Sequence, residues 1–202
     1  MVCGSAPVTS PNDVLDFWFP PATRPDSRQP DGRDDPRWFQ ADAGFDAAIR
    51  DRFGGAVGQA ASGALDRWAD TPDGALALIV LLDQFPRNIF RGDRRAFDND
   101  AHARRLADAA LSRGFDQALP KVMRKFFYLP FEHAEDLASQ DRSVALFTAL
   151  GDPETLRYAE RHRDIVRRFG RFPHRNALLG RPSTAEETAW LDAGGDTFGT
   201  SV

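Results

Sequence analysis

Three titratable side chains stand at positions where the pattern of apolar residues predicts burial. Asp83 directly follows the apolar run Ala75–Leu82, and an isolated carboxylate in a protein interior is costly unless it has a partner. His162 falls within the apolar face of its helix when residues are placed about 100° apart. His133 lies among three acids. An imidazole near a buried carboxylate is suited to general acid–base catalysis, so Asp83, His133 and His162 are candidate catalytic groups.

Each of these groups also has a structural interpretation. A buried aspartate can be half of an ion pair that ties two helix ends together, here with Arg87 or an arginine near the C-terminal end. A histidine on an apolar face is more often a core residue with a satisfied hydrogen bond than a ligand. If the whole set is a structural network, substitutions in it chiefly lower the melting temperature.

A short motif occurs twice in the chain. The segment 83–88, Asp-Gln-Phe-Pro-Arg-Asn, is matched by 170–176, Gly-Arg-Phe-Pro-His-Arg-Asn, in which one residue is inserted. Each proline is expected to stop a helix, and the polar residues beside it then have helix-end carbonyls or a bound anion as partners. Ordinary turn chemistry explains the same residues about as well. The candidate ligand-binding residues are Gln84, Arg87, Asn88, Arg171, His174, Arg175 and Asn176.

No metal or cofactor is predicted. Glu132 and Asp136 stand four residues apart, and His133 stands three from Asp136, which is permissible spacing for metal ligands. Acids at a helix start equally fit a solvated turn, and the specific zinc and di-iron motifs are absent. The glycine-rich phosphate loops and the hydrolase nucleophile motif are also absent. The single cysteine, Cys3, excludes an intrachain disulfide.

The pattern of apolar residues predicts that these side chains are carried by helices. Apolar residues recur at three- and four-residue steps almost throughout, and no convincing alternating strand is present. We expect an all-α single domain over residues 1–202, built from eight or nine short antiparallel helices, with a surface loop around residues 20–36. The expected helices begin at Pro11 and span Phe45–Trp68, Thr71–Leu82, Asp100–Arg113, Leu119–Tyr128, Ser139–Leu150, Glu154–Phe169 and Ser183–Leu191. The run Ala75–Leu82 is apolar on every face and should be the central element.

Composition and charge exclude several classes of protein. Hydrophobic residues make up 42% of the chain and charged residues 28%, which is typical of a soluble globular protein. No apolar run approaches the length of a membrane span, and a reducing cytoplasmic location is the simplest expectation. The part Arg91–Arg181 carries eighteen Lys and Arg against thirteen Asp and Glu, although the whole chain has a net charge of −4. Few aromatic residues accompany these arginines, so a small anion is expected rather than a nucleic acid.

Several segments together resemble a known family, the bacterial and eukaryotic proteins grouped as domain of unknown function 924. The resemblance is carried by 14–19, 37–39, 81–91, 127–133, 162–165, 168–176 and 180–187, nearly the whole chain. It implies an all-helical fold similar to tetratricopeptide-type right-handed superhelices, and it implies no agreed activity. The family's motif positions fall on the three candidate catalytic groups and the seven candidate ligand-binding residues named above.

The sequence therefore supports one hypothesis of function and one alternative. The hypothesis is a pocket where the two Phe-Pro turns converge, in which Asp83, His133 and His162 surround a small anionic molecule bound by arginines. The alternative is a non-enzymatic helical scaffold that binds a peptide or protein partner in its groove. The sequence leaves the oligomeric state open.

Overall fold

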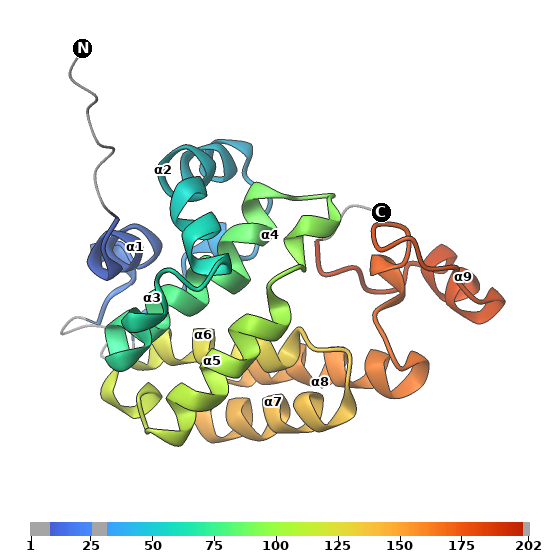
Figure 1. Ribbon diagram of the computed structural model, residues 1–202. Helices are drawn as coiled ribbons and strands as arrows, with labels where there is room; N and C mark the ends of the chain where they lie inside the picture. Colours follow the sequence, from blue (N-terminus) through green and yellow to red (C-terminus); the bar gives the residue numbers. More distant parts are fainter. Residues whose placement is uncertain (1–8, 26–31, 200–202) are drawn as a thin grey trace, which may run out of the picture.

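The apolar run that the sequence placed at the centre is fully enclosed. We describe a computed structural model of the protein over residues 9–25 and 32–199 (Figure 1). Helix α3, Pro72–Ile79, begins at Thr71, whose side chain accepts a hydrogen bond from the backbone of Gly74, and has Pro72 in its first turn. The side chains from Ala75 to Leu82 are at most 1% exposed. The described residues contain helices and turns but no strand, which confirms the all-α prediction.

The other helices of the described residues are α1 Pro11–Trp18, α2 Ala43–Ala61, α4 Phe85–Ile89, α5 Asp100–Ser112, α6 Lys121–Glu132, α7 Leu137–Leu150, α8 Pro153–Phe169 and α9 Ala185–Asp192. Of these helices, α1, α5 and α6 pack against α3. Helices α6, α7 and α8 pack side by side, and α2 packs on α4 (Figure 1). Helix α9 and the segment that follows α8 form a small lobe at the edge opposite α1. No helix of the described residues is long and apolar enough to cross a membrane.

An aromatic cluster joins the N-terminal segments to the central helices. The rings of Trp18, Trp38, Phe85 and Phe126 lie within 6.0 Å of a neighbour in the cluster, centroid to centroid. The indole N–H of Trp38 also donates a hydrogen bond of 2.8 Å to the Trp18 carbonyl. Such ring contacts add to the stabilisation from apolar burial. They fix the segment 34–41, which forms one wall of the site described below.

Two prolines do not end their helices, contrary to the sequence-based expectation. After α3 the chain makes a π-helical turn, Val80–Gln84, and continues into α4 with Pro86 in its first turn. Helix α6 runs through Pro130 to Glu132. A proline removes its own N–H donor and crowds the carbonyl four residues earlier, and a widened turn such as Val80–Gln84 accommodates both effects. This continuation brings the π turn and the end of α6 together.

Two helix boundaries also differ from those expected. Helix α2 ends at Ala61 rather than near Trp68, because Gly63 adopts a positive φ of 80°. Helix α9 begins after Thr184, which forms a capping box with Glu187, whereas the expected helix begins at Ser183. The expected surface loop includes residues 26–31, which lie outside the described residues. The remaining helix starts and stops agree with the sequence to within a few residues.

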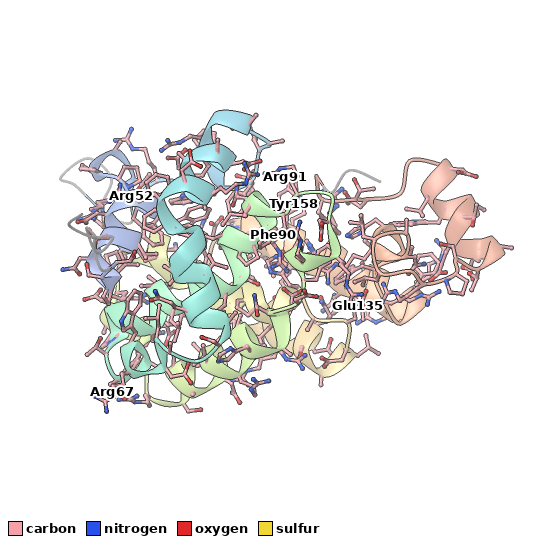
Figure 2. All side chains as sticks on the ribbon, turned by 45° about the horizontal axis from the view of Figure 1, so that its top comes forward. Arg52, Arg67, Phe90, Arg91, Glu135 and Tyr158 are labelled. Atoms are coloured by element: carbon pink, nitrogen blue, oxygen red, sulfur yellow. The ribbon has the colours of Figure 1, made fainter. Side chains whose placement is uncertain are left out.

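Glu135 attaches the C-terminal lobe to the rest of the molecule. Arg52 and Arg67 lie on the side formed by the N-terminal helices, whereas Glu135 lies where the C-terminal lobe joins the rest (Figure 2). Glu135 accepts a hydrogen bond of 2.8 Å from the backbone N–H of Phe172 and bonds of 2.6 and 2.9 Å from Arg181. These bonds attach the second Phe-Pro turn to the end of α6.

Candidate functional site

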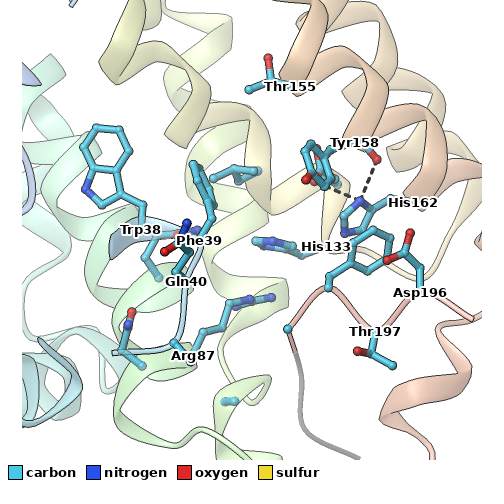
Figure 3. Close-up of a pocket in the computed structure, with 18 of the residues that line it drawn as sticks. Trp38, Phe39, Gln40, Arg87, His133, Thr155, Tyr158, His162, Asp196 and Thr197 are labelled. Carbon is cyan, nitrogen blue, oxygen red and sulfur yellow. Dashed lines mark hydrogen bonds and ion pairs between the residues drawn. The ribbon is translucent and has the colours of Figure 1, made fainter. Parts of the chain in front are cut away.

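A cavity of about 760 Å³ opens where α4, the end of α6, α8, the segment 34–41 and the segment 196–199 meet. This volume lies in the range typical of small-molecule sites. The close-up in Figure 3 shows His133 between Arg87 and Phe39 on one side and His162 and Tyr158 on the other. Of the predicted residues, Gln84, Arg87, Asn88, His133, His162, His174 and Arg175 line this cavity.

Asp83 lies behind the cavity wall and contacts His133. Its Oδ1 is 2.8 Å from Nδ1 of His133, its Oδ2 accepts a 2.5 Å bond from Gln84, and its side chain is fully buried. Burial alone favours the neutral acid, but Arg87 and His133 outweigh burial and hold the pKa of Asp83 far below its ordinary value. An ionised carboxylate only accepts hydrogen bonds, so Nδ1 of His133 carries the proton and Nε2 keeps its lone pair.

His133 itself is neutral at neutral pH. Its burial, together with the charge of Arg87, lowers its pKa, and this outweighs the opposite effect of Asp83. No described residue is hydrogen-bonded to its Nε2. The imidazole is therefore a base, oriented by Asp83, whose free nitrogen is available to a molecule in the cavity.

Glu132 precedes His133 and lies against His162. Oε1 of Glu132 is 3.2 Å from Nδ1 of His162, and the same nitrogen is 2.9 Å from the Tyr158 carbonyl. Burial, and secondly the charge of Asp83, raise the pKa of Glu132 to about 8, so it is a neutral acid at pH 7. Burial lowers the pKa of His162 well below its ordinary value. The Tyr158 carbonyl accepts the Nδ1 proton, which leaves Nε2 of His162 with its lone pair.

The two Phe-Pro turns converge through an aspartate that the sequence did not single out. Nη1 of Arg87, in the first turn, is 2.9 Å from Oδ1 of Asp100, and Nη1 of Arg175, in the second, is 3.5 Å from its Oδ2. Nη1 of Arg175 also donates a 3.0 Å bond to the His133 carbonyl. Asp100 opens helix α5, and its sequence position indicates only a helix start. Its bridging role depends on long-range packing.

Part of the second turn is buried with polar atoms that lack partners. Among the described residues, Nε of Arg175 and Nδ1 of His174 have no hydrogen-bond partner, although both residues are less than 7% exposed. Burial, with a further contribution from Arg87, lowers the pKa of Arg175 to about 10, so it stays charged at pH 7. Burial and the charge of Arg175 lower the pKa of His174 to about 3. Buried polar atoms without partners are uncommon and often mark a functional site.

Other predicted residues are placed elsewhere. Arg171 makes bonds of 2.6 and 2.8 Å to Glu187 and does not line the cavity. Asn176 donates to Ser183 and Glu187, also outside the cavity lining. The Asn88 amide faces Asp46 at 2.7 Å, although the residue touches the cavity. The repeated motif therefore contains residues that line the cavity and residues that pair with groups elsewhere. The repeat in the sequence does not distinguish the two.

Sequence reasoning did not single out several aromatic residues and one lysine that line the cavity. Phe39 and Tyr158 are 53% and 39% exposed and both line the cavity. The Phe198 ring stacks on His162 with centroids 3.5 Å apart. Lys125, 3% exposed, binds Asp34 at 2.6 Å. The exposure of Tyr158 had no signal in the sequence, because an apolar residue on a helix is expected to face the core.

Among residues 9–25 and 32–199, no group of three or more His, Cys, Asp or Glu side chains is arranged to hold a metal ion. Asp136, a member of the spacing pattern noted in the sequence, instead caps α7 and accepts a 2.8 Å bond from the Ser139 backbone.

Comparisons with known proteins agree with this architecture. The family model described as "Bacterial protein of unknown function (DUF924)" matches residues 14–195. A solved structure of a protein of unknown function from Agrobacterium tumefaciens is 47% identical, with a TM-score of 0.80, and the match covers 91% of this chain and 97% of that chain. A comparison with curated proteins found no match. The family resemblance is confirmed: this chain belongs to the DUF924 family of bacterial proteins of unknown function.

Proposed function

We propose that the cavity binds a small, singly charged anion, which is held chiefly by Arg175. The observation that carries this proposal is the buried guanidinium of Arg175, whose Nε–H has no acceptor among the described residues. An arginine fork is suited to a carboxylate or phosphate oxygen, and leaving a buried charged donor unpaired is costly. Arg175 lines the cavity, so an anion that binds there after a small shift of this side chain would supply the missing acceptor.

The charges around the inner end of the cavity limit how much negative charge a ligand can carry. Arg87 and Arg175 are opposed by Asp83 and Asp100, so these four groups balance. His133, His162 and His174 have lowered pKa values, and Glu132 has a raised one, so these four groups add no charge at pH 7. A dianion or a nucleic-acid backbone would need an excess of positive charge that this end lacks.

Titration calorimetry with acetate, pyruvate and inorganic phosphate tests this proposal. We expect the monoanions to bind, and we expect Arg175→Gln to weaken that binding about tenfold or more, since a bond to a charged group contributes about 1.5–3 kcal/mol. The matched control is Arg171→Gln, which removes an arginine of the same turn that pairs with Glu187 outside the cavity. This control should lower the melting temperature and leave the dissociation constant within about twofold.

Two results would contradict the proposal. One is that wild-type protein binds no anion, and the other is that both arginine variants weaken binding equally. Native mass spectrometry of the purified protein, compared with its denatured mass, adds an independent measurement. A small anion that is lost on denaturation would identify the natural occupant.

The second candidate function is a scaffold with a tetratricopeptide-like right-handed superhelix that binds a peptide. The exposed rings of Phe39 and Tyr158 at the cavity mouth favour it, because exposed aromatic side chains serve as anchors in protein interfaces. A peptide that binds by these rings would lose affinity in Phe39→Ala and keep it in Arg175→Gln. The anion site predicts the opposite ranking.

A further inference from the structure

The cavity holds a base and an acid on adjacent residues. His133 presents the free Nε2 of a neutral imidazole, and Asp83 fixes this tautomer from behind at 2.8 Å. Glu132, 4% exposed, lines the same cavity. Anion binding explains the arginines, but it uses neither the oriented base nor the buried carboxyl group. Both groups need a further explanation.

The surroundings of Glu132 keep its carboxyl group protonated. From the neighbouring elements it faces Asp83 of the π turn and His162 of α8, with Arg87 and Arg175 paired to Asp83 and Asp100 close by. No arginine or lysine of the described residues forms an ion pair with Glu132. A neutral carboxylic acid in a buried site is a hydrogen-bond and proton donor, the form that stabilises an enol or enolate oxygen.

The described part of the cavity lining lacks the nucleophiles typical of acyl transfer. The described residues that line it include threonine hydroxyls but no serine or cysteine, so the usual nucleophiles of acyl transfer are not found there. A base, an acid and a site for one carboxylate are what enolisation beside a carbonyl group requires. The smallest substrates that carry both groups are 2-oxo carboxylates.

Building on the anion site proposed above, we propose that the protein catalyses proton transfer on a 2-oxo carboxylate. Arg175 binds the carboxylate. Nε2 of His133 removes a proton from the carbon next to the carbonyl group, and the Glu132 carboxyl donates its proton to the carbonyl oxygen. The electron pair of the broken C–H bond becomes the C=C bond of the enol. His133 ends as imidazolium and Glu132 as carboxylate, and return of both protons restores the starting state.

The test is hydrogen–deuterium exchange at C3 of 2-oxobutyrate, followed by proton NMR in D₂O with the full-length protein. We expect the protein to accelerate exchange beyond the same concentration of free imidazole. His133→Gln and Glu132→Gln should each reduce the rate about 100-fold or more, the usual size of general acid–base effects. The dissociation constant of 2-oxobutyrate should stay within about threefold in both variants, since Arg175 still binds the carboxylate.

A matched histidine control uses His102, which lies on α5 outside the cavity lining, 3.9 Å from Asp66. His102→Gln should exchange at the wild-type rate. Asp83 is a positioning residue, and Asp83→Asn should lose exchange because the amide donates to Nδ1 and moves the proton to Nε2. If Asp83→Asn or His133→Gln fails to fold, Glu132→Gln still decides, because it replaces one neutral group with another of the same shape.

The outcomes separate this inference from the anion site. Binding of 2-oxobutyrate without exchange, or exchange that survives both His133→Gln and Glu132→Gln, would overturn the proton-transfer role and leave the anion site standing. Hydrolysis of a nitrophenyl ester by His133 without exchange would also overturn it, in favour of water activation. If neither 2-oxobutyrate nor any other monoanion binds, the proposed function itself fails.

Discussion

Two polar clusters at the C-terminal side of the molecule differ in how completely their groups are paired. The Glu187 cluster consists of Arg171, Asn176, Thr184 and Glu187. Glu187 accepts two bonds from Arg171, one from Asn176 and one from the Thr184 backbone. The hydrogen bonds from Arg171, opposed by desolvation, hold the pKa of Glu187 at about 2. Each polar group of this cluster has a protein partner.

The second cluster, the pocket cluster, consists of Asp83, Glu132, His133, His162 and Arg175. It contains a neutral acid, two neutral imidazoles and a guanidinium whose Nε has no partner among the described residues. A completely paired polar network stabilises a fold. An incompletely paired one lowers the stability, and a functional role is one reason for a protein to retain it. The comparison shows that one copy of the motif supplies two kinds of group. Arg171 forms a structural pair with Glu187, and Arg175, four residues later, is the proposed binding group.

The largest stability effect is expected in the Glu187 cluster. Glu187→Ala removes the capping box of α9 and the bonds to Arg171 and Asn176 together. We expect the free energy of unfolding to fall by about 2 kcal/mol, because a helix cap and a buried charged acceptor are lost at once. Urea denaturation measures this change. Anion affinity should be unchanged, and a loss of affinity equal to that of Arg175→Gln would remove the distinction between the clusters.

Glu132→Gln should raise the free energy of unfolding in alkaline solution, which is the opposite of the effect of Glu187→Ala. The pKa of Glu132 is raised in the folded state, to about 8, so the unfolded chain releases its proton first. Folding stability therefore falls as pH rises from the ordinary glutamate pKa to about 8, and the full penalty is present above that. At pH 9 we expect Glu132→Gln to be more stable than wild type by at least about 1.4 kcal/mol, the value of one pKa unit. If the difference in stability between Glu132→Gln and wild type were the same at pH 4 and pH 9, the raised pKa of Glu132 would be contradicted.

Phe198→Ala tests how the C-terminal segment covers the pocket cluster. The variant loses the stacked contact with His162, for which we expect a fall in the free energy of unfolding of about 1 kcal/mol. Burial is the main cause of the lowered pKa of His162, so greater exposure should raise this pKa toward its ordinary value. An NMR titration of the His162 ring protons measures it. An unchanged pKa would show that Phe198 does not bury the imidazole.

The smallest expected effect is on the pH dependence of anion binding. Ionisation of Glu132 above pH 8 adds a negative charge to the cavity wall, so the affinity for acetate should fall about threefold between pH 7 and pH 9 at physiological salt. In Glu132→Gln the affinity should be constant over that range. Calorimetry at both pH values provides the measurement, and the same fall in both proteins would assign the effect to another group.

The helical fold was largely predictable because its signals are local. Proline at the first turn of α1 and α8, glycine after α7, and the apolar run of α3 all predict elements that the structure contains. The helix through Pro130 was not predictable, because the packing that compensates for its missing N–H comes from distant parts of the chain. The tetratricopeptide-like superhelix that the family resemblance implies stays a prediction.

The candidate site was predictable in part. Asp83, His133 and His162 were selected for burial and charge, and the structure brings them together, with His133 and His162 in the cavity lining and Asp83 behind His133. The roles of Arg171 and Arg175 were not separable, because both arginines follow the same helix end and only tertiary contacts decide which one meets Glu187. Asp100 escaped notice because a helix-start aspartate usually needs no other explanation.

The most direct measurement compares the two arginines in one spectrum. The Nε–H signals of Arg171 and Arg175 can be assigned in a nitrogen–proton correlation spectrum from the Arg171→Lys and Arg175→Lys variants. We predict that titration with pyruvate shifts the Nε–H signal of Arg175 to saturation and leaves that of Arg171, already bonded to Glu187, in place. An Arg175 signal that does not move while pyruvate binds, or equal shifts of both signals, would contradict the account of the cavity as an anion site.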